Sequence, residues 1–230
     1  MTTLAIIKPK PKVLTEDLGK ILEYAICSLY DTNYVGNFKY SKEDAEKLRM
    51  RIQKLKELRP YSYTHTALKS NLHDFTCDEK HLSVKSCKSG WKICPQIIGQ
   101  PTKKKFCEYF CIPSTSTDAE IKSFIQNNLN RCLTSYFENT FHCDVVFYGK
   151  KQDTVQLIES KPIDWTNHAY ELSRKDEAWR ESTTLRVKQN DRWHSLGEFQ
   201  VHAHRDCIKF RFNLKTLLTV FPDSFLSRII

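Results

Sequence analysis

Two short apolar hairpins, each flanked by helical sequence, restrict most strongly what this chain can fold into. Residues 74–85 alternate apolar and polar side chains around a turn at 78–80, and residues 143–159 repeat this arrangement around 149–153. Apolar residues recur at three- and four-residue spacing in 16–30 and 118–137, which predicts amphipathic helices. This mixture predicts an α/β (α+β) fold, with a central mixed β-sheet flanked by helices.

The remaining sequence predicts a charged second helix and a β-rich C-terminal part. Capping residues start the second helix near 41, and Pro60 ends it. Beyond Pro162 we expect a short helix over 170–179, strands over 184–188 and 196–212, and a helix over 214–221. The chain then divides into a core with N-terminal helices (1–161) and a β-ribbon and helix extension packed on it (162–230).

Positive charge is concentrated in one segment. The 230 residues hold 36 Lys and Arg against 27 Asp and Glu, a net charge of +9, which favours polyanionic partners. Residues 81–107 contain six lysines and no acidic residue. A basic segment of this length suits a phosphate backbone. The candidate nucleic-acid contacts in it are Lys88, Lys92, Gln100, Lys103, Lys104 and Lys105.

The cysteines are expected to be reduced. Their number, nine, is odd, and the apolar run near the N-terminus is too short for a signal-peptide core or a membrane span. These features predict a cytoplasmic protein that does not enter a membrane. No paired two-residue cysteine spacing exists, so a structural zinc site is not expected.

The first hairpin carries candidate catalytic side chains. Folding 74–77 onto 81–85 brings Asp74 close to Ser83 and Lys85, which share one face of their strand. A carboxylate can bind a hard divalent cation, and a nearby ammonium group can stabilise phosphate charge or help to deprotonate water. Such a pair is suited to metal-dependent phosphodiester hydrolysis.

This arrangement resembles the PD-(D/E)XK nucleases, and among them the type II restriction endonucleases. The order helix, three-strand meander, helix, strand matches that core over residues 15–160. The resemblance implies that Asp74 is the aspartate of the motif, Val84 its variable residue and Lys85 its lysine, in a restriction-endonuclease-like core with a C-terminal β-rich annex. It also makes Gln100 similar to the glutamine that some members place after the lysine strand.

Two positions depart from the motif. His73 stands where the family has proline, and Ser83 stands where it has the second acid. The resemblance then assigns the missing ligand to Glu23, on the first helix, so that Asp74 and Glu23 are the expected Mg²⁺ ligands. The alternative for Glu23 is an ordinary ion pair with Lys20.

The second hairpin offers an alternative catalytic set. Asp144, Glu159 and Lys161 provide a complete acid, acid and lysine. Topology favours the first hairpin, since a helix and a strand follow it as the core requires. Either hairpin could instead be a surface turn with solvated charges.

The C-terminal strands carry side chains suited to reading bases. Gln200 and His202 share one strand face with Glu198, and Arg205 follows in the turn. A two-stranded ribbon fits the major groove, where Gln, His and Arg contact base edges. We therefore treat Gln200, His202 and Arg205 as candidate DNA contacts.

The resemblance implies a Mg²⁺-dependent, sequence-specific endodeoxyribonuclease. Its expected partners are double-stranded DNA, a second copy in a homodimer and a cognate DNA methyltransferase. Because Ser83 replaces an acid, a catalytically inactive nucleic-acid-binding protein with a nuclease-like fold is the alternative. An RNA-processing nuclease is a third, less favoured interpretation.

Overall fold

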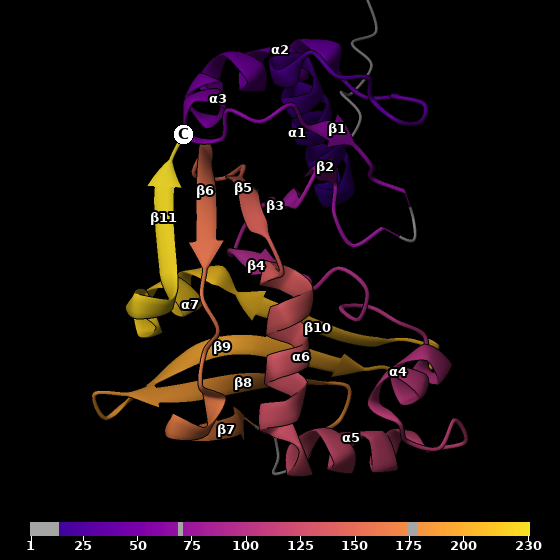
Figure 1. Ribbon diagram of the computed structural model, residues 1–230. Helices are drawn as coiled ribbons and strands as arrows, with labels where there is room; N and C mark the ends of the chain where they lie inside the picture. The colour runs from indigo at the N-terminus through magenta and orange to yellow at the C-terminus, as the bar shows by residue number, and fades with distance from the viewer. Residues whose placement is uncertain (1–13, 69–70, 174–178) are drawn as a thin grey trace, which may run out of the picture.

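The computed structural model describes residues 14–68, 71–173 and 179–230. Its first sheet has six strands in the order β1-β2-β3-β5-β6-β11 (Figure 1). Strands β3 and β5 are parallel, whereas the other neighbours are antiparallel. The expected central mixed sheet is confirmed. Its strands are β1 (Thr64–His65), β2 (Phe75–Cys77), β3 (Lys80–Cys87), β5 (Asp144–Gly149), β6 (Thr154–Ser160) and β11 (Phe225–Ile229).

A second sheet of five antiparallel strands lies below the first in Figure 1, in the order β4-β10-β9-β8-β7. The helix expected over 170–179 is wrong at its start, because residues 170–173 form a strand paired with β8 and pack their apolar side chains on the core. Residues 174–178 of that expected helix lie outside the described residues. The strands are β4 (Lys92–Ile93), β7 (Tyr170–Ser173), β8 (Ser182–Gln189), β9 (Arg192–Val201) and β10 (Ile208–Asn213).

The helices form two groups, one on each sheet. The expected helix over 118–137 is divided at Asn128, whose non-helical backbone separates α5 from α6. The first group comprises α1 (Thr15–Tyr30), α2 (Lys42–Arg51) and α3 (Gln53–Leu58), and the second comprises α4 (Lys103–Phe110), α5 (Asp118–Asn127), α6 (Leu129–Phe141) and α7 (Leu214–Val220). Short 3₁₀ turns cover Trp165–Asn167 and Pro222–Ser224.

Strand β3 separates two apolar cores. Leu82 and Val84 pack in a core with buried residues of α1 to α3, while Cys87 belongs to the core formed by α4 to α7 and the second sheet. Strand side chains alternate between faces, so Ser83 and Lys85 point away from Leu82 and Val84. All four side chains are buried. Lys85 is therefore a cation placed in a largely apolar interior, which is costly unless it is paired.

The two sheets exchange strands across the expected boundary at 161/162. Strand β11, near the C-terminus, pairs with β6 in the first sheet, and β4, from the first half of the chain, pairs with β10 in the second. Backbone ladders therefore join the two parts in both directions.

No helix within the described ranges combines the length and apolar character needed to cross a membrane. All nine cysteines are free thiols.

Candidate active site

Asp74 is fixed to β3 through its backbone and its side chain. It directly precedes β2, and its N–H donates to the Leu82 carbonyl at 3.0 Å. Its Oδ2 accepts a hydrogen bond from the Val84 N–H at 2.6 Å. The tight turn between β2 and β3, with Asp78 at a left-handed φ of 49°, sets this register. The hairpin thus brings Asp74 beside Lys85, as the spacing predicted.

The carboxyl group of Asp74 is buried, which disfavours its charged form. The residue is only 6% exposed. Burial raises the pKa of its carboxyl group, the Lys85 ammonium acts against that shift, and the Glu23 carboxylate adds to it. A cation bound between the two carboxylates would lower the pKa of Asp74.

Lys85 has a polar partner that the sequence analysis missed. Its Nζ donates a hydrogen bond to Oε1 of Gln96, in the loop between β4 and α4. That loop closes tightly at Gly99, where a Cβ would lie 2.3 Å from the Pro95 carbonyl oxygen. The expected glutamine, Gln100, is exposed near the start of α4. Among the described residues, Gln96 and not Gln100 accepts the hydrogen bond from Lys85, and a DNA-binding role for Gln100 stays a prediction.

Ser83 stands at the position of the second acid and supplies no carboxylate. It is fully buried, and its hydroxyl faces the thiol of Cys143, lowering the pKa that burial otherwise raises for that thiol. The metal ligand that an acid would provide at this position has to come from another element.

Glu23 reaches the site from α1, where it is 5% exposed. Lys20, one turn earlier, donates to it at 2.8 Å, which is the ion pair weighed as the alternative. His65 also contacts it, with Nε2 lying 3.2 Å from Oε2. Because Nδ1 of His65 accepts from the Val35 N–H, the ring proton lies on Nε2 and is donated to Glu23. The glutamate is thus both paired and close enough to Asp74 to influence its pKa.

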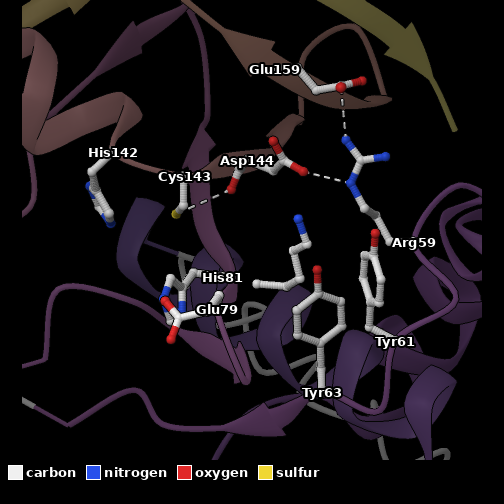
Figure 2. Close-up of a pocket in the computed structure, with 10 residues that line it drawn as sticks. Arg59, Tyr61, Tyr63, Glu79, His81, His142, Cys143, Asp144 and Glu159 are labelled. Carbon is white, nitrogen blue, oxygen red and sulfur yellow. Dashed lines mark hydrogen bonds and ion pairs between the residues drawn. The ribbon is translucent and has the colours of Figure 1, made fainter.

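The acids of the second hairpin are neutralised by arginine (Figure 2). Arg59 Nε lies 2.5 Å from Asp144 Oδ2, and its Nη2 lies 3.1 Å from Glu159 Oε2. Arg228 adds a second ion pair to Glu159 at 2.8 Å. Arg59, Asp144 and Glu159 border a cleft of about 390 Å³. Lys161 lies exposed after β6, and its N–H donates to the Ser224 carbonyl.

On the candidate base-reading face of β9, hydrogen bonds from neighbouring side chains surround the Glu198 carboxylate. Glu198 receives hydrogen bonds from Lys92 at 2.6 Å, Gln200 at 2.9 Å and Arg211 at 3.0 Å. Burial raises the pKa of Glu198, but these neighbours outweigh it and bring the pKa to about 2. His202 continues the row, with Nε2 lying 3.4 Å from Gln200 Oε1. Gln200 and His202 share a face, as predicted.

The other candidate DNA contacts differ in whether their side chains already form ion pairs within the protein. Lys103 pairs with Asp118 at 2.5 Å, and Lys104 lies 3.9 Å from Glu108. Within the described part of the chain, Lys88 and Lys105 form no ion pair. Arg205 is exposed between β9 and β10. These residues are distributed over the bend after β3, β4, α4 and the β9–β10 turn, and the N–H of Lys103 donates to the Asp206 carboxylate in that turn.

Comparison with known proteins gives one informative similarity. The chain is 43% identical over 218 residues to the type II restriction enzyme CviAII of Paramecium bursaria Chlorella virus 1. The similarity covers 93% of this chain and 62% of that protein, so the chain spans less than two thirds of its relative. No family model matches the sequence, and no solved structure matches it. The chain is therefore similar to a type II restriction enzyme over most of its own length.

Proposed function

We propose that this protein is a Mg²⁺-dependent, sequence-specific endodeoxyribonuclease that hydrolyses phosphodiester bonds of double-stranded DNA. The observation that carries the proposal is the buried Asp74 carboxylate, hydrogen-bonded to the strand that carries Lys85. The 43% identity to a type II restriction enzyme supports the same activity. The acids of the second hairpin are already paired with arginine, which favours the first hairpin.

The residues around Asp74 suit a hard divalent cation. Asp74 and Glu23 would hold Mg²⁺, because both offer carboxylate oxygens and their charges interact in a buried site. The ion would polarise the scissile phosphodiester and lower the pKa of water bound to it. Glu23 would supply the carboxylate ligand that Ser83 lacks. Hydrogen bonds from His65 and Lys20 hold its carboxylate in place.

Lys85 would act on the attacking water and on the phosphate. Its ammonium group would stabilise negative charge on the phosphate oxygens or help to remove a proton from water. Its contact with Gln96 orients the ammonium group before DNA arrives. Preorganised charge of this kind contributes to catalysis without reorganisation during the reaction.

DNA would be bound by two sets of side chains. Lys88 and Lys105 would contact phosphates, with Lys92, Lys103 and Lys104 extending the basic surface. Gln200, His202 and Arg205 would contact base edges. A homodimer would match a palindromic site, and a cognate methyltransferase would protect the host DNA.

A catalytically inactive DNA-binding protein remains the second candidate function, and the buried Ser83 favours it. The test is cleavage of plasmid and phage-length DNA by purified protein in Mg²⁺ and in EDTA. Our proposal predicts discrete fragments in Mg²⁺ only. DNA binding by folded protein, without cleavage in Mg²⁺ or Mn²⁺, would instead support the binding protein.

The role of Glu23 is tested by its dependence on Mg²⁺. Glu23→Gln keeps the shape of the side chain and removes its charge, so cleavage should require a higher Mg²⁺ concentration. Glu16→Gln, on the exposed first turn of the same helix, is the matched control and should leave that concentration unchanged. An unchanged Mg²⁺ requirement in Glu23→Gln would remove Glu23 from the proposed site.

A further inference from the structure

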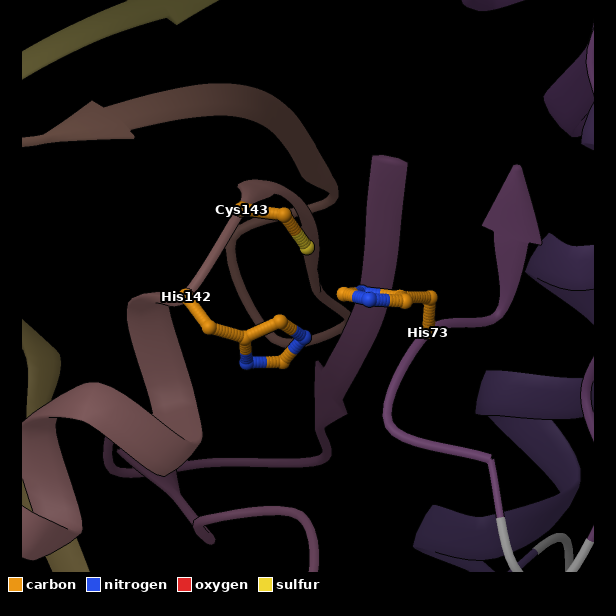
Figure 3. A group of neighbouring side chains, drawn as sticks. All are labelled: His73, His142 and Cys143. Atoms are coloured by element: carbon orange, nitrogen blue, oxygen red, sulfur yellow. The ribbon is translucent and has the colours of Figure 1, made fainter. Parts of the chain in front are cut away.

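Three potential metal ligands meet beside the candidate active site (Figure 3). One ligand atom each from His73, His142 and Cys143 lies within 4.8 Å of the other two. His73 directly precedes Asp74, His142 caps the C-terminus of α6, and Cys143 directly precedes β5. The three side chains come from two chain segments far apart in the sequence and point toward a common space.

The imidazole nitrogens of this cluster have few hydrogen-bond partners within the described residues. Nδ1 of His73 and both ring nitrogens of His142 are buried and have no hydrogen bond of ordinary geometry among the described residues. The backbone carbonyls of Glu138 and Leu72 face the His142 ring. Buried polar atoms without partners are uncommon in folded proteins and require an explanation.

The other contacts of these three side chains position them but leave their ligand atoms able to bind a metal. The ring of His81 stacks on His73 with centroids 3.8 Å apart and planes within 8°. The thiol of Cys143 donates a long hydrogen bond of 3.5 Å to the carbonyl of Asp144, and the Ser83 hydroxyl faces it. A carbonyl that faces a histidine is also the usual partner for the ring N–H on the side away from a metal.

We propose that His73, His142 and Cys143 bind one Zn²⁺ ion, with water in the fourth position. Zinc prefers imidazole nitrogen and thiolate sulfur, whereas Mg²⁺ prefers oxygen ligands. Ligand atoms on a tetrahedral zinc lie roughly 3.3–3.9 Å apart. Since the three ligand atoms lie within 4.8 Å of one another, no separation has to close by more than about 1.5 Å.

The proposed zinc would join two segments on either side of β3, the strand that carries Lys85. It would connect the segment before β2 to the junction of α6 and β5, and β3 lies between β2 and β5 in the sheet. The position of Asp74 would then be restrained through its neighbour His73. This zinc site is separate from the proposed Mg²⁺ site, and its existence does not depend on nuclease activity.

The test measures zinc itself. Native mass spectrometry and competition with a chromogenic chelator should show one Zn²⁺ per chain for wild type. Cys143→Ser and His142→Asn should weaken binding by at least roughly 10–100-fold. Asp74→Asn and Cys111→Ser, the latter at an exposed thiol, are the controls and should bind as wild type does.

If the variants fail to fold, two measurements on wild type test zinc binding by Cys143 instead. Co²⁺ added to zinc-free wild type should give a thiolate-to-cobalt charge-transfer band, and Zn²⁺ should protect Cys143, but not Cys111, from alkylation. The proposal is overturned if wild type binds no zinc, if Cys143→Ser binds it unchanged, or if Asp74→Asn abolishes binding.

Discussion

The carboxylate of Asp74 accepts a 2.6 Å hydrogen bond from the backbone N–H of Val84, the residue directly before Lys85. Since the N–H of Asp74 also pairs with the Leu82 carbonyl, two bonds fix Asp74 against this strand. Strand register therefore sets the position of the Asp74 carboxylate, while Gln96 holds the Lys85 ammonium group. Sites built on strands hold their geometry more precisely than sites built on loops.

Replacing Lys85 should separate cleavage from binding. Lys85→Ala removes the ammonium group beside Asp74, so cleavage should fall by roughly 10²–10⁴-fold while DNA affinity changes little. Lys80→Ala, at the exposed start of the same strand, is the control and should cleave normally. Cleavage rates and dissociation constants measured on one DNA duplex check both points. Unchanged cleavage by Lys85→Ala would exclude this lysine from the reaction.

The arginine between Asp144 and Glu159 should contribute to stability. Arg59→Ala leaves two partly buried carboxylates without that partner, so the free energy of unfolding should fall by roughly 1–3 kcal/mol. Arg49→Ala, which breaks the more exposed pair with Glu46, should cost about 0–1 kcal/mol. Urea unfolding measures both. Equal losses would mean that the Arg59 contacts have no special structural value.

Lys88 and Lys105 should account for part of the salt dependence of DNA binding. If each contacts one phosphate, its replacement by alanine should reduce the slope of log affinity against log salt by about 0.9. Lys54→Ala, on exposed α3, is the control and should keep the wild-type slope. Fluorescence anisotropy at several salt concentrations provides the measurement. Slopes that match wild type in both variants would place the DNA elsewhere.

Glu198 should make folding stability depend on acid pH. Its pKa is lowered from 4.5 to about 2 in the folded protein, so its ionised form stabilises the fold above pH 4.5. That contribution should be lost as the pH falls from 4.5 toward 2. The difference in unfolding free energy between wild type and Glu198→Gln should therefore shrink over this range. A difference that stays constant from pH 4.5 to 2 would contradict a lowered pKa for Glu198.

Local patterns were sufficient to predict the first hairpin and which of its polar side chains lie close together. The turn at Asp78 and the alternation on both sides of it fix the register, and the register alone brings Asp74 beside Lys85. The amphipathic spacing of α1 likewise predicted a helix that carries Glu23 into the interior. These features depend on residues close in the sequence, where spacing determines geometry.

Contacts between distant segments could not be predicted in this way. Arg59 meets Asp144 across 85 positions, and no local pattern distinguishes it from a solvated arginine. The same holds for His65 against Glu23, for the pairing of β11 with β6, and for the meeting of His73 with Cys143. The strand at 170–173 was missed because its partner, β8, determines its conformation.

The most direct test of the central claim compares Asp74→Asn with Glu159→Gln in one cleavage assay. Both changes remove a single carboxylate charge, and circular dichroism establishes that each variant is folded. We expect wild type and Glu159→Gln to give the same discrete DNA fragments in Mg²⁺, and Asp74→Asn to give none. Fragments from Asp74→Asn, with none from Glu159→Gln, would contradict this expectation and move the active site to the second hairpin.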